Sequence, residues 1–167
     1  MRVYGVTGWK NAGKTGLMER LVAEFSARGM SVSTIKHAHH AVDVDQKGTD
    51  SYRHREAGAR EVVLASAKRF AVMHELRDAE EPTLEALIAR LAPVDLVLVE
   101  GYKRAPHPKI EAYRAAAGNP LIAPESASIR AVAADCEVKA PCPVLPLDDT
   151  GAIADFILAD LGLREAS

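Results

Sequence analysis

The sequence predicts an α/β fold of three layers, with a mainly parallel sheet and some antiparallel strands added. Strand-like and helix-like segments alternate along most of the chain, as in proteins built on a parallel sheet. The run Leu96-Val97-Leu98-Val99 is unbroken and apolar, which is typical of a central strand covered on both faces. Residues 3–6 form a short strand-like run that leads into a glycine-rich loop and a helix presenting Leu17, Leu21 and Phe25 on one face.

Local start and stop signals define the other elements. Gly29 ends the first helix, Ser51 is the expected cap of a short helix reaching about residue 59, and Thr83 caps a helix that Pro93 ends. The final helix carries an apolar face and closes at Gly162. The expected strands are residues 3–6, 32–35, 61–66, 69–74, 96–99, 110–114, 131–134 and 144–145. Residues 61–66 and 69–74 are joined by so tight a turn that they must pair antiparallel.

Length and composition predict one domain over residues 1–167. The net charge of −2 gives no general attraction to nucleic acid or membrane. No apolar run approaches the roughly 18 residues of a membrane span, and the first strand leaves no room for a signal peptide, so we expect a cytoplasmic protein. Cys136 and Cys142 lack the spacing of a zinc site, and reduced core or loop thiols are favoured over a disulfide.

The stretch Gly8-Trp9-Lys10-Asn11-Ala12-Gly13-Lys14-Thr15 matches G-x-x-x-x-G-K-[ST], the phosphate-binding P-loop, in its expected place between strand and helix. Backbone amides and the positive end of the helix dipole favour a bound phosphate there. The glycines allow close approach of the anion. Lys14 can reach the β- and γ-phosphates, and the Thr15 hydroxyl can bind Mg²⁺. The fold class is therefore that of a P-loop NTPase, with a nucleotide bound along residues 8–16.

Two acids flank the central strand. P-loop NTPases place an acid for Mg²⁺ at the carboxyl end of a strand beside the loop. Asp95 lies roughly 16 Å from Glu100, at about 3.3 Å per residue, and therefore at the wrong end. Ligands bind outside the carboxyl ends of parallel strands, which selects Glu100, and Gly101 would keep backbone bulk away from the metal. Lys14 and Glu100 are the candidate catalytic residues.

Residues 36–50 form a polar loop that begins at the carboxyl end of the second strand. His37, His39 and His40 could suggest a transition-metal site, but they lack the spacing of helical zinc ligands. Contact of Lys36 and His37 with phosphate or Mg²⁺-bound water is favoured, with Asp43 or Asp45 as an outer-sphere acid, and a solvated loop remains the alternative.

Together these segments resemble the MobB family of molybdopterin-guanine dinucleotide biosynthesis adapter proteins. The resemblance rests on the P-loop and on the stretches 36–45, 50–59 and 98–103, and it extends from residue 1 to about residue 114, more loosely through 131–135 and the last helix. Gly16 departs from the family pattern, in which Ser or Thr is commoner, and weakens the first helical turn by up to about 1 kcal/mol.

The resemblance implies a homodimer that binds GTP with Mg²⁺, has feeble GTPase activity, and works beside the guanylyltransferase that joins GMP to molybdopterin. The metal would be held by Thr15, Glu100 and Asp45. Guanine specificity comes from the resemblance alone, and Asp135 is a weak candidate for contact with the base, with a turn acid as the more ordinary role. The basic residues Lys103, Arg104, His107 and Lys109 could hold a pterin phosphate, contact an acidic partner or lie on a solvated surface.

Three functions fit these features. The first is an adapter that binds GTP and Mg²⁺ and presents nucleotide or cofactor to a partner enzyme. The second is a P-loop kinase or NTPase acting on a small molecule. The third is a switch in which an ordered 36–50 loop controls a partner. Because no arginine finger or catalytic glutamine is assigned, the adapter is favoured.

Overall fold

The computed structural model describes residues 1–38 and 43–163. Its contacts divide the chain into two compact units. Met1–His37 and Arg90–Ser167 make up one, called here the sheet unit, and Ala38–Ala89 make up the other, called the hairpin unit. Among the described residues, no helix is both long enough and apolar enough to span a membrane.

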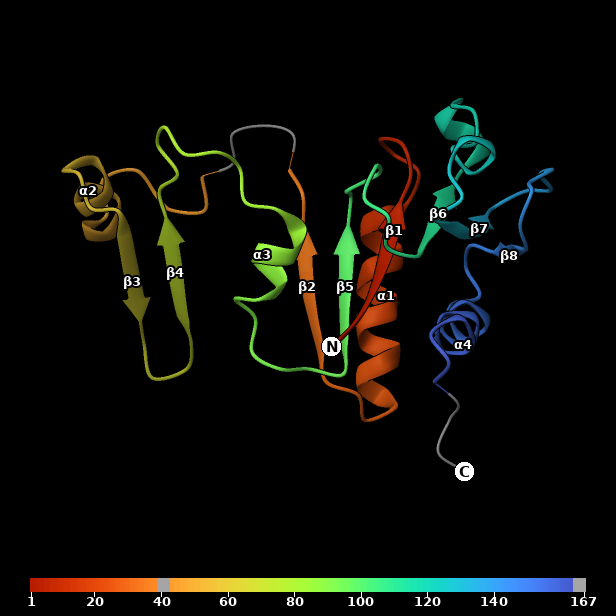
Figure 1. The fold of residues 1–167 in the computed structure, drawn as a ribbon, viewed down its shortest axis with the longest axis horizontal. Helices are drawn as coiled ribbons and strands as arrows, with labels where there is room; N and C mark the ends of the chain where they lie inside the picture. Colours follow the sequence, from red (N-terminus) through yellow and green to blue (C-terminus); the bar gives the residue numbers. More distant parts are fainter. Residues whose placement is uncertain (39–42, 164–167) are drawn as a thin grey trace. The chain divides into compact units, whose positions relative to one another are not determined.

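The sheet unit is built on six strands in the order β2-β5-β1-β6-β7-β8, and every neighbouring pair is parallel (Figure 1). The strands are β1 (Arg2–Thr7), β2 (Val32–Lys36), β5 (Leu96–Glu100), β6 (Lys109–Tyr113), β7 (Ile129–Ala134) and β8 (Val144–Pro146). All five residues of β5 are buried, as its apolar run predicts. The predicted α/β class with a mainly parallel sheet is confirmed.

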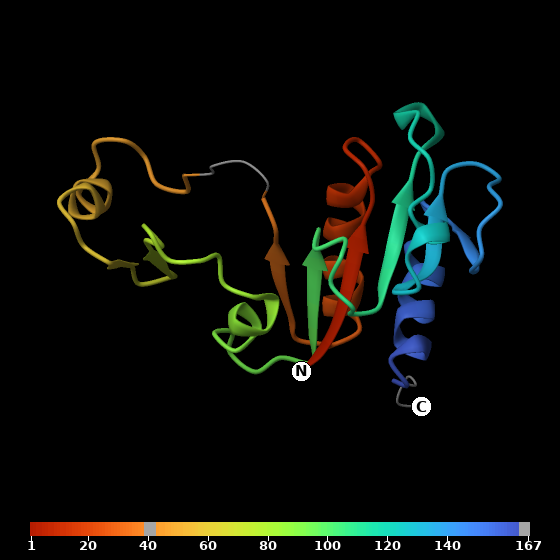
Figure 2. The ribbon, with the colours of Figure 1, turned by 45° about the horizontal axis from the view of Figure 1, so that its top comes forward.

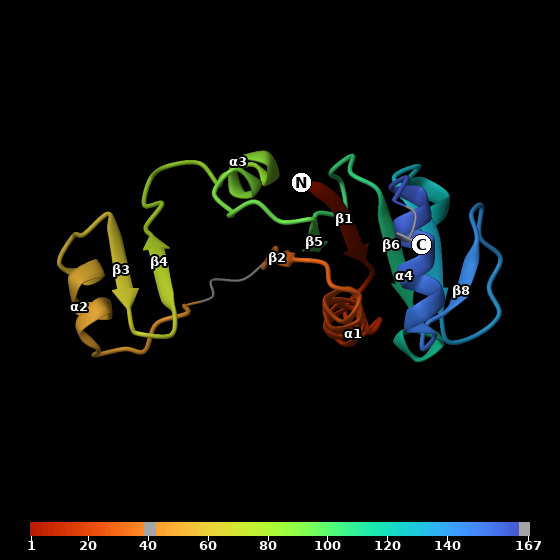
Figure 3. The same ribbon diagram turned by 90° about the horizontal axis from the view of Figure 1, so that it is seen from below.

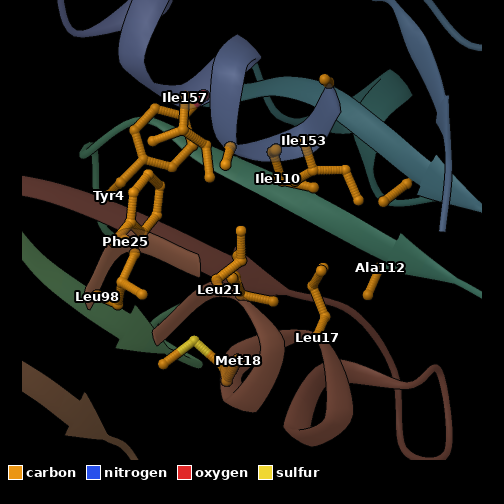
Figure 4. Close-up of a cluster of buried hydrophobic side chains, with 14 of the residues drawn as sticks. Tyr4, Leu17, Met18, Leu21, Phe25, Leu98, Ile110, Ala112, Ile153 and Ile157 are labelled. Carbon is orange, nitrogen blue, oxygen red and sulfur yellow. The ribbon is translucent and has the colours of Figure 1, made fainter. Parts of the chain in front are cut away.

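Helices α1 (Lys14–Ala27) and α4 (Thr150–Asp160) pack together, and α1 runs along one face of the sheet (Figure 3). Leu17, Leu21 and Phe25, predicted on one face of α1, are fully buried. Figure 4 shows them packed with Tyr4 of β1 and Ile157 of α4 in one apolar cluster. This core fixes the start of α1 against the end of β1, where the glycine-rich loop lies.

The opposite face of the sheet combines a small apolar cluster with buried charges. The 3₁₀ helix η2 (Ala123–Glu125) covers β7, whereas η1 (Ala115–Ala117) follows β6. The side chains of Lys109 and Glu111 on β6 are completely buried. Glu111 accepts hydrogen bonds from the amides of Ile122 and Ala123, so it anchors the segment that leads into η2.

Strand register brings the functional strand ends to one edge. Val6 of β1 and Lys36 of β2 both lie beside Glu100 of β5. In Figure 2 the arrowheads of β2, β5 and β6 point toward this edge. The glycine-rich loop, which follows β1, therefore meets the carboxyl end of β5, as the parallel-sheet argument predicts.

The hairpin unit holds α2 (Asp50–Glu56), the antiparallel strands β3 (Glu61–Ala65) and β4 (Phe70–His74), and α3 (Leu84–Ile88). The antiparallel pair is confirmed, and it forms a sheet of its own. Thr83 caps α3 as predicted, with its hydroxyl accepting from the amide of Ala86. The prediction for this helix is wrong at both ends, because its cap is Thr49 rather than Ser51 and it ends at Glu56 rather than near residue 59.

Ion pairs stabilise the described part of the hairpin unit, whose residues enter neither of the two apolar clusters. Arg55 contacts the carboxylates of Asp43, Asp45 and Glu75 at 2.9, 3.4 and 2.6 Å. Hydrogen bonds to Glu75 and Asp43 raise the pKa of Arg55. The hydroxyls of Ser51 and Thr49 both donate to Asp45 at 3.0 Å, and Thr49, the cap of α2, also accepts from the amide of Tyr52.

Candidate nucleotide-binding site

The loop between β1 and α1 has a backbone that depends on its two glycines. Gly8 and Gly13 have φ values of +142° and +92°, a region that side chains disfavour. A Cβ on Gly8 would lie 2.5 Å from the carbonyl oxygen of Ala112. The loop is therefore pressed against β6 where any larger residue would displace it.

The first turn of α1 is left open to an anion. Its N-cap, Gly13, provides no side-chain hydrogen bond, and the first turn contains no acidic residue. Among the described residues, the amides of Lys14, Thr15 and Gly16 donate to no carbonyl group. Orphan amides and the helix dipole together favour a negative group at this position. The Thr15 side chain is exposed and its hydroxyl forms no hydrogen bond with the described part of the chain.

Lys14 lies over the loop in a cationic environment. Its ammonium group donates to the carbonyl oxygen of Trp9 at 2.6 Å. Burial lowers the pKa of Lys14, Glu100 opposes that change, and Lys103 and Lys36 add to it. Lys14 thus interacts with two other ammonium groups and one carboxylate, and the net positive field of these groups complements a magnesium-bound triphosphate.

Glu100 is the acid of this edge. It is 8% exposed, and its carboxylate lies 3.5 Å from the ammonium of Lys36. Asp95 lies at the amino end of β5, where it accepts hydrogen bonds from the amide and hydroxyl of Ser31. The structure therefore agrees with the choice of Glu100 over Asp95 as the acid near the loop.

Backbone hydrogen bonds connect the ends of β1, β2 and β5 around Gly101. The amide of His37 donates to the carbonyl of Glu100 at 2.9 Å, and the amide of Gly101 donates to that of Val6 at 3.1 Å. Gly101 has φ of +97°, and a Cβ there would lie 3.1 Å from the Cβ of His37. The His37 ring stacks on Tyr102 at 4.6 Å. The close approach of His37 is therefore a second reason for a glycine at position 101, in addition to the room needed for the predicted metal.

Trp9 links the loop to two neighbouring segments. Its indole N–H donates to the carbonyl of Pro120 at 2.8 Å, and the ammonium of Lys103 lies 3.9 Å from the centre of its ring. Of the other predicted loop residues, Lys10 and Asn11 are exposed and Ala12 is buried.

Asp45 belongs to the hairpin unit, and its carboxylate accepts from Ser51, Thr49 and Arg55. Burial raises the pKa of Asp45, but these hydrogen bonds together lower it. Its contact with a metal stays a prediction. His39 and His40 lie outside the described residues, and within the described ones no group of three or more His, Cys, Asp and Glu side chains could hold a metal.

Four basic residues after β5 were predicted to form an accessible surface, and the prediction is wrong for two of them, His107 and Lys109. Lys109 is fully buried and donates to the carbonyl of Ala105 and, at 3.0 Å, to the hydroxyl of Ser128. The His107 ring packs against Gly5, where a Cβ would lie 2.6 Å from Nε2. Lys103 and Arg104 remain accessible to a ligand.

Asp135, the weak candidate for contact with the base, accepts from the amide of Ala115 at 2.9 Å, which is the role of a turn acid.

Two features of the site were not predicted from the sequence. One is the contact of Lys103 with Trp9, which joins residues 94 positions apart in the chain. The other is Arg114, whose Nε would lie 2.9 Å from a Cβ on Gly13. The available signal was its position as the last residue of the strand predicted over residues 110–114.

These features define a class of protein. A parallel sheet with β1 at its centre, a glycine loop leading into α1, and an acid at the end of β5 form a P-loop NTPase fold.

Comparison with known proteins gives the family. The model of the family molybdopterin guanine dinucleotide synthesis protein B (MobB) matches residues 3–135, and the chain belongs to this family. A molybdopterin-guanine dinucleotide biosynthesis adapter protein from Escherichia coli (strain K12) is 39% identical over 156 residues, covering 90% of this chain and 87% of that protein. The protein of the same description from Haemophilus influenzae is 40% identical over 158 residues, with 93% and 86% covered. The crystal structure of a MobB homologue from Bacillus stearothermophilus superposes with a TM-score of 0.69 at 29% identity, covering 98% of this chain and all of that one.

Proposed function

We propose that this protein is a GTP- and Mg²⁺-binding adapter in molybdopterin guanine dinucleotide synthesis, assisting the guanylyltransferase that attaches GMP to molybdopterin. The observation that carries the nucleotide-binding part is the open first turn of α1, with uncapped amides and three lysines around it. The biosynthetic role is supported by the similarity to the adapter proteins of Escherichia coli and Haemophilus influenzae.

The donor set at the strand ends fits a hard divalent cation. The Thr15 hydroxyl and the Glu100 carboxylate would hold Mg²⁺, which prefers oxygen ligands. When bound, the ion would neutralise charge on the phosphates. Lys14 would orient the β- and γ-phosphates, and Lys36 would balance the charge of Glu100 when no metal is bound.

Slow hydrolysis follows from the same residues. The lysines, together with the Mg²⁺ that Glu100 would hold, would provide charge stabilisation, which is a large part of phosphoryl-transfer catalysis. Efficient GTPases also orient the attacking water with a glutamine. The chain has a single glutamine, Gln46, and no such role is assigned to it. We therefore expect nucleotide binding to dominate over turnover.

A homodimer is also part of the proposal, and the hairpin supports it. Val63, Val72 and Phe70 lie on one face of the β3–β4 pair and are 61%, 52% and 73% exposed. Two-stranded sheets are marginal alone in water, and exposed apolar faces mark interfaces. Each strand also has one edge with no partner strand among the described residues, and such an edge favours pairing with another chain. A second copy of the chain is the occupant that this face fits.

The test is a calorimetric panel of GTP and ATP, with Mg²⁺ and with EDTA, repeated with the guanylyltransferase present. Binding of GTP that requires Mg²⁺, together with faster formation of the guanine dinucleotide, is expected. Absence of nucleotide binding would refute the proposal. Multiple-turnover transfer of labelled γ-phosphate to a small acceptor would replace the adapter with a kinase.

A further inference from the structure

Arg114 occupies a fixed backbone position at the edge of the P-loop. It directly follows β6 and keeps an extended conformation, with φ of −128° and ψ of 130°. Its carbonyl accepts from the amide of Ala117 at 3.0 Å, and the next amide, of Ala115, is held by Asp135. Strand pairing on one side and a capped 3₁₀ turn on the other thus set the direction of the side chain.

The side chain is directed to the start of α1. Ile110 and Ala112 of β6 face the core that contains α1, and Arg114 continues this alternation. Its Nε and Cζ lie 2.9 and 3.5 Å from the position of a Cβ on Gly13. Gly13 therefore makes room for a guanidinium group as well as for a phosphate.

This guanidinium has no acceptor in the described protein. Arg20, Arg28 and Arg55 each donate to a carboxylate, hydroxyl or carbonyl group. Arg114 is exposed, and its side chain forms no hydrogen bond or ion pair with any described residue. An arginine held in place by its backbone, with all its donors free beside an anion site, is prepared for a ligand.

The order of strands indicates which end of the nucleotide it meets. Glu100 and Lys36, which belong to the metal and γ-phosphate side, lie on β5 and β2. β6 lies on the other side of β1. If the γ-phosphate points toward β5, the nucleoside leaves the loop toward β6, where Arg114 stands.

We propose that Arg114 binds the nucleoside end of the nucleotide by stacking its guanidinium on the base. This inference rests on the nucleotide binding proposed above and adds a residue that recognises the base. Arginine is suited to the role because its planar, weakly hydrated group stacks on aromatic faces. The contact is independent of the phosphate grip that Lys14 and the loop amides provide.

The test compares GTP with inorganic tripolyphosphate, which has the phosphates but no nucleoside. Dissociation constants would be measured by calorimetry for the unmodified protein, Arg114→Ala and Arg2→Ala. Arg2 is an exposed arginine at the amino end of β1, so its replacement matches the change in charge at the opposite edge of the sheet. We expect Arg114→Ala to weaken GTP about ten-fold, in the range of a partly desolvated cation–π contact, and to leave tripolyphosphate within about two-fold.

The outcomes are distinct. Equal weakening of both ligands would make Arg114 a phosphate contact and overturn its assignment to the base. Unchanged GTP affinity in Arg114→Ala, with normal binding by the unmodified protein, would overturn the inference while nucleotide binding stands. An unmodified protein that binds neither ligand would refute the nucleotide site and this inference with it. A loss of equal size in Arg2→Ala would show a general charge effect and count against a stacking contact.

Discussion

Replacing the buried lysine of β6 should remove a pH dependence of stability. Lys109 is fully buried, and burial lowers its pKa from 10.5 to about 8. The unfolded chain keeps this proton up to about pH 10.5, whereas the folded protein releases it near pH 8. Between these values the unfolded state binds more protons, so the lysine makes the free energy of unfolding rise with pH.

The size of the effect follows from the pKa difference. At 1.36 kcal/mol per pKa unit, the full difference is worth about 3 kcal/mol, and the part realised between pH 7 and pH 10 is about 2.5 kcal/mol. Below pH 8 the penalty for burying the charged amine is fully present, and it is relieved as the pH rises. In Lys109→Met this contribution disappears, although the loss of hydrogen bonds to Ala105 and Ser128 adds a constant cost of about 1–3 kcal/mol.

The assay is urea unfolding of the unmodified protein and Lys109→Met at pH 7, 8, 9 and 10. The stability of the unmodified protein minus that of the variant should grow by about 2.5 kcal/mol over this range, because other titrating groups are common to both. Lys139→Met is the matched control, and its difference should stay flat since that exposed amine is solvated in both states. A flat difference for Lys109→Met would refute the reasoning.

Three other predictions address the loop, the acid and the hairpin. Gly8→Ala should weaken GTP binding and lower the free energy of unfolding by about 2 kcal/mol, because its φ of +142° and the nearby carbonyl of Ala112 exclude a Cβ; normal calorimetry and urea curves would contradict this. Glu100→Gln should reduce the gain in GTP affinity that Mg²⁺ provides, and a metal titration identical to that of the unmodified protein would exclude Glu100 as a ligand. Phe70→Lys should convert a dimer into a monomer in light scattering, by placing a charge on the exposed hairpin face; an unmodified protein that is already monomeric at micromolar concentration would contradict the proposed interface.

The parts of the site that the sequence predicts are those that depend on short-range patterns. The P-loop is contiguous, so its glycines, lysine and threonine are recognisable without knowledge of the rest of the fold. Glu100 follows from the apolar run of β5 and the rule that parallel strands bind ligands at their carboxyl ends. Both positions agree with the structure.

The parts that the sequence misses depend on contacts distant along the chain. Lys109 resembles a surface residue, but in the fold it is fully buried, with its ammonium group bonded to Ala105 and Ser128 of neighbouring segments. Thr49 and Ser51 are equally good caps by residue type, and both hydroxyls donate to Asp45, so only the backbone of the folded segment identifies Thr49 as the cap. Local residue preferences give no information on the burial of Lys109 or on which residue caps α2.

The central claim is that the P-loop binds the phosphates of a nucleoside triphosphate. The most direct measurement is a crystal structure of the protein with a non-hydrolysable GTP analogue and Mg²⁺. We predict the phosphates against the amides of residues 13–16, with the ammonium of Lys14 moved from the Trp9 carbonyl to a phosphate oxygen. Density for the analogue elsewhere, with Lys14 still bonded to Trp9, would contradict the claim.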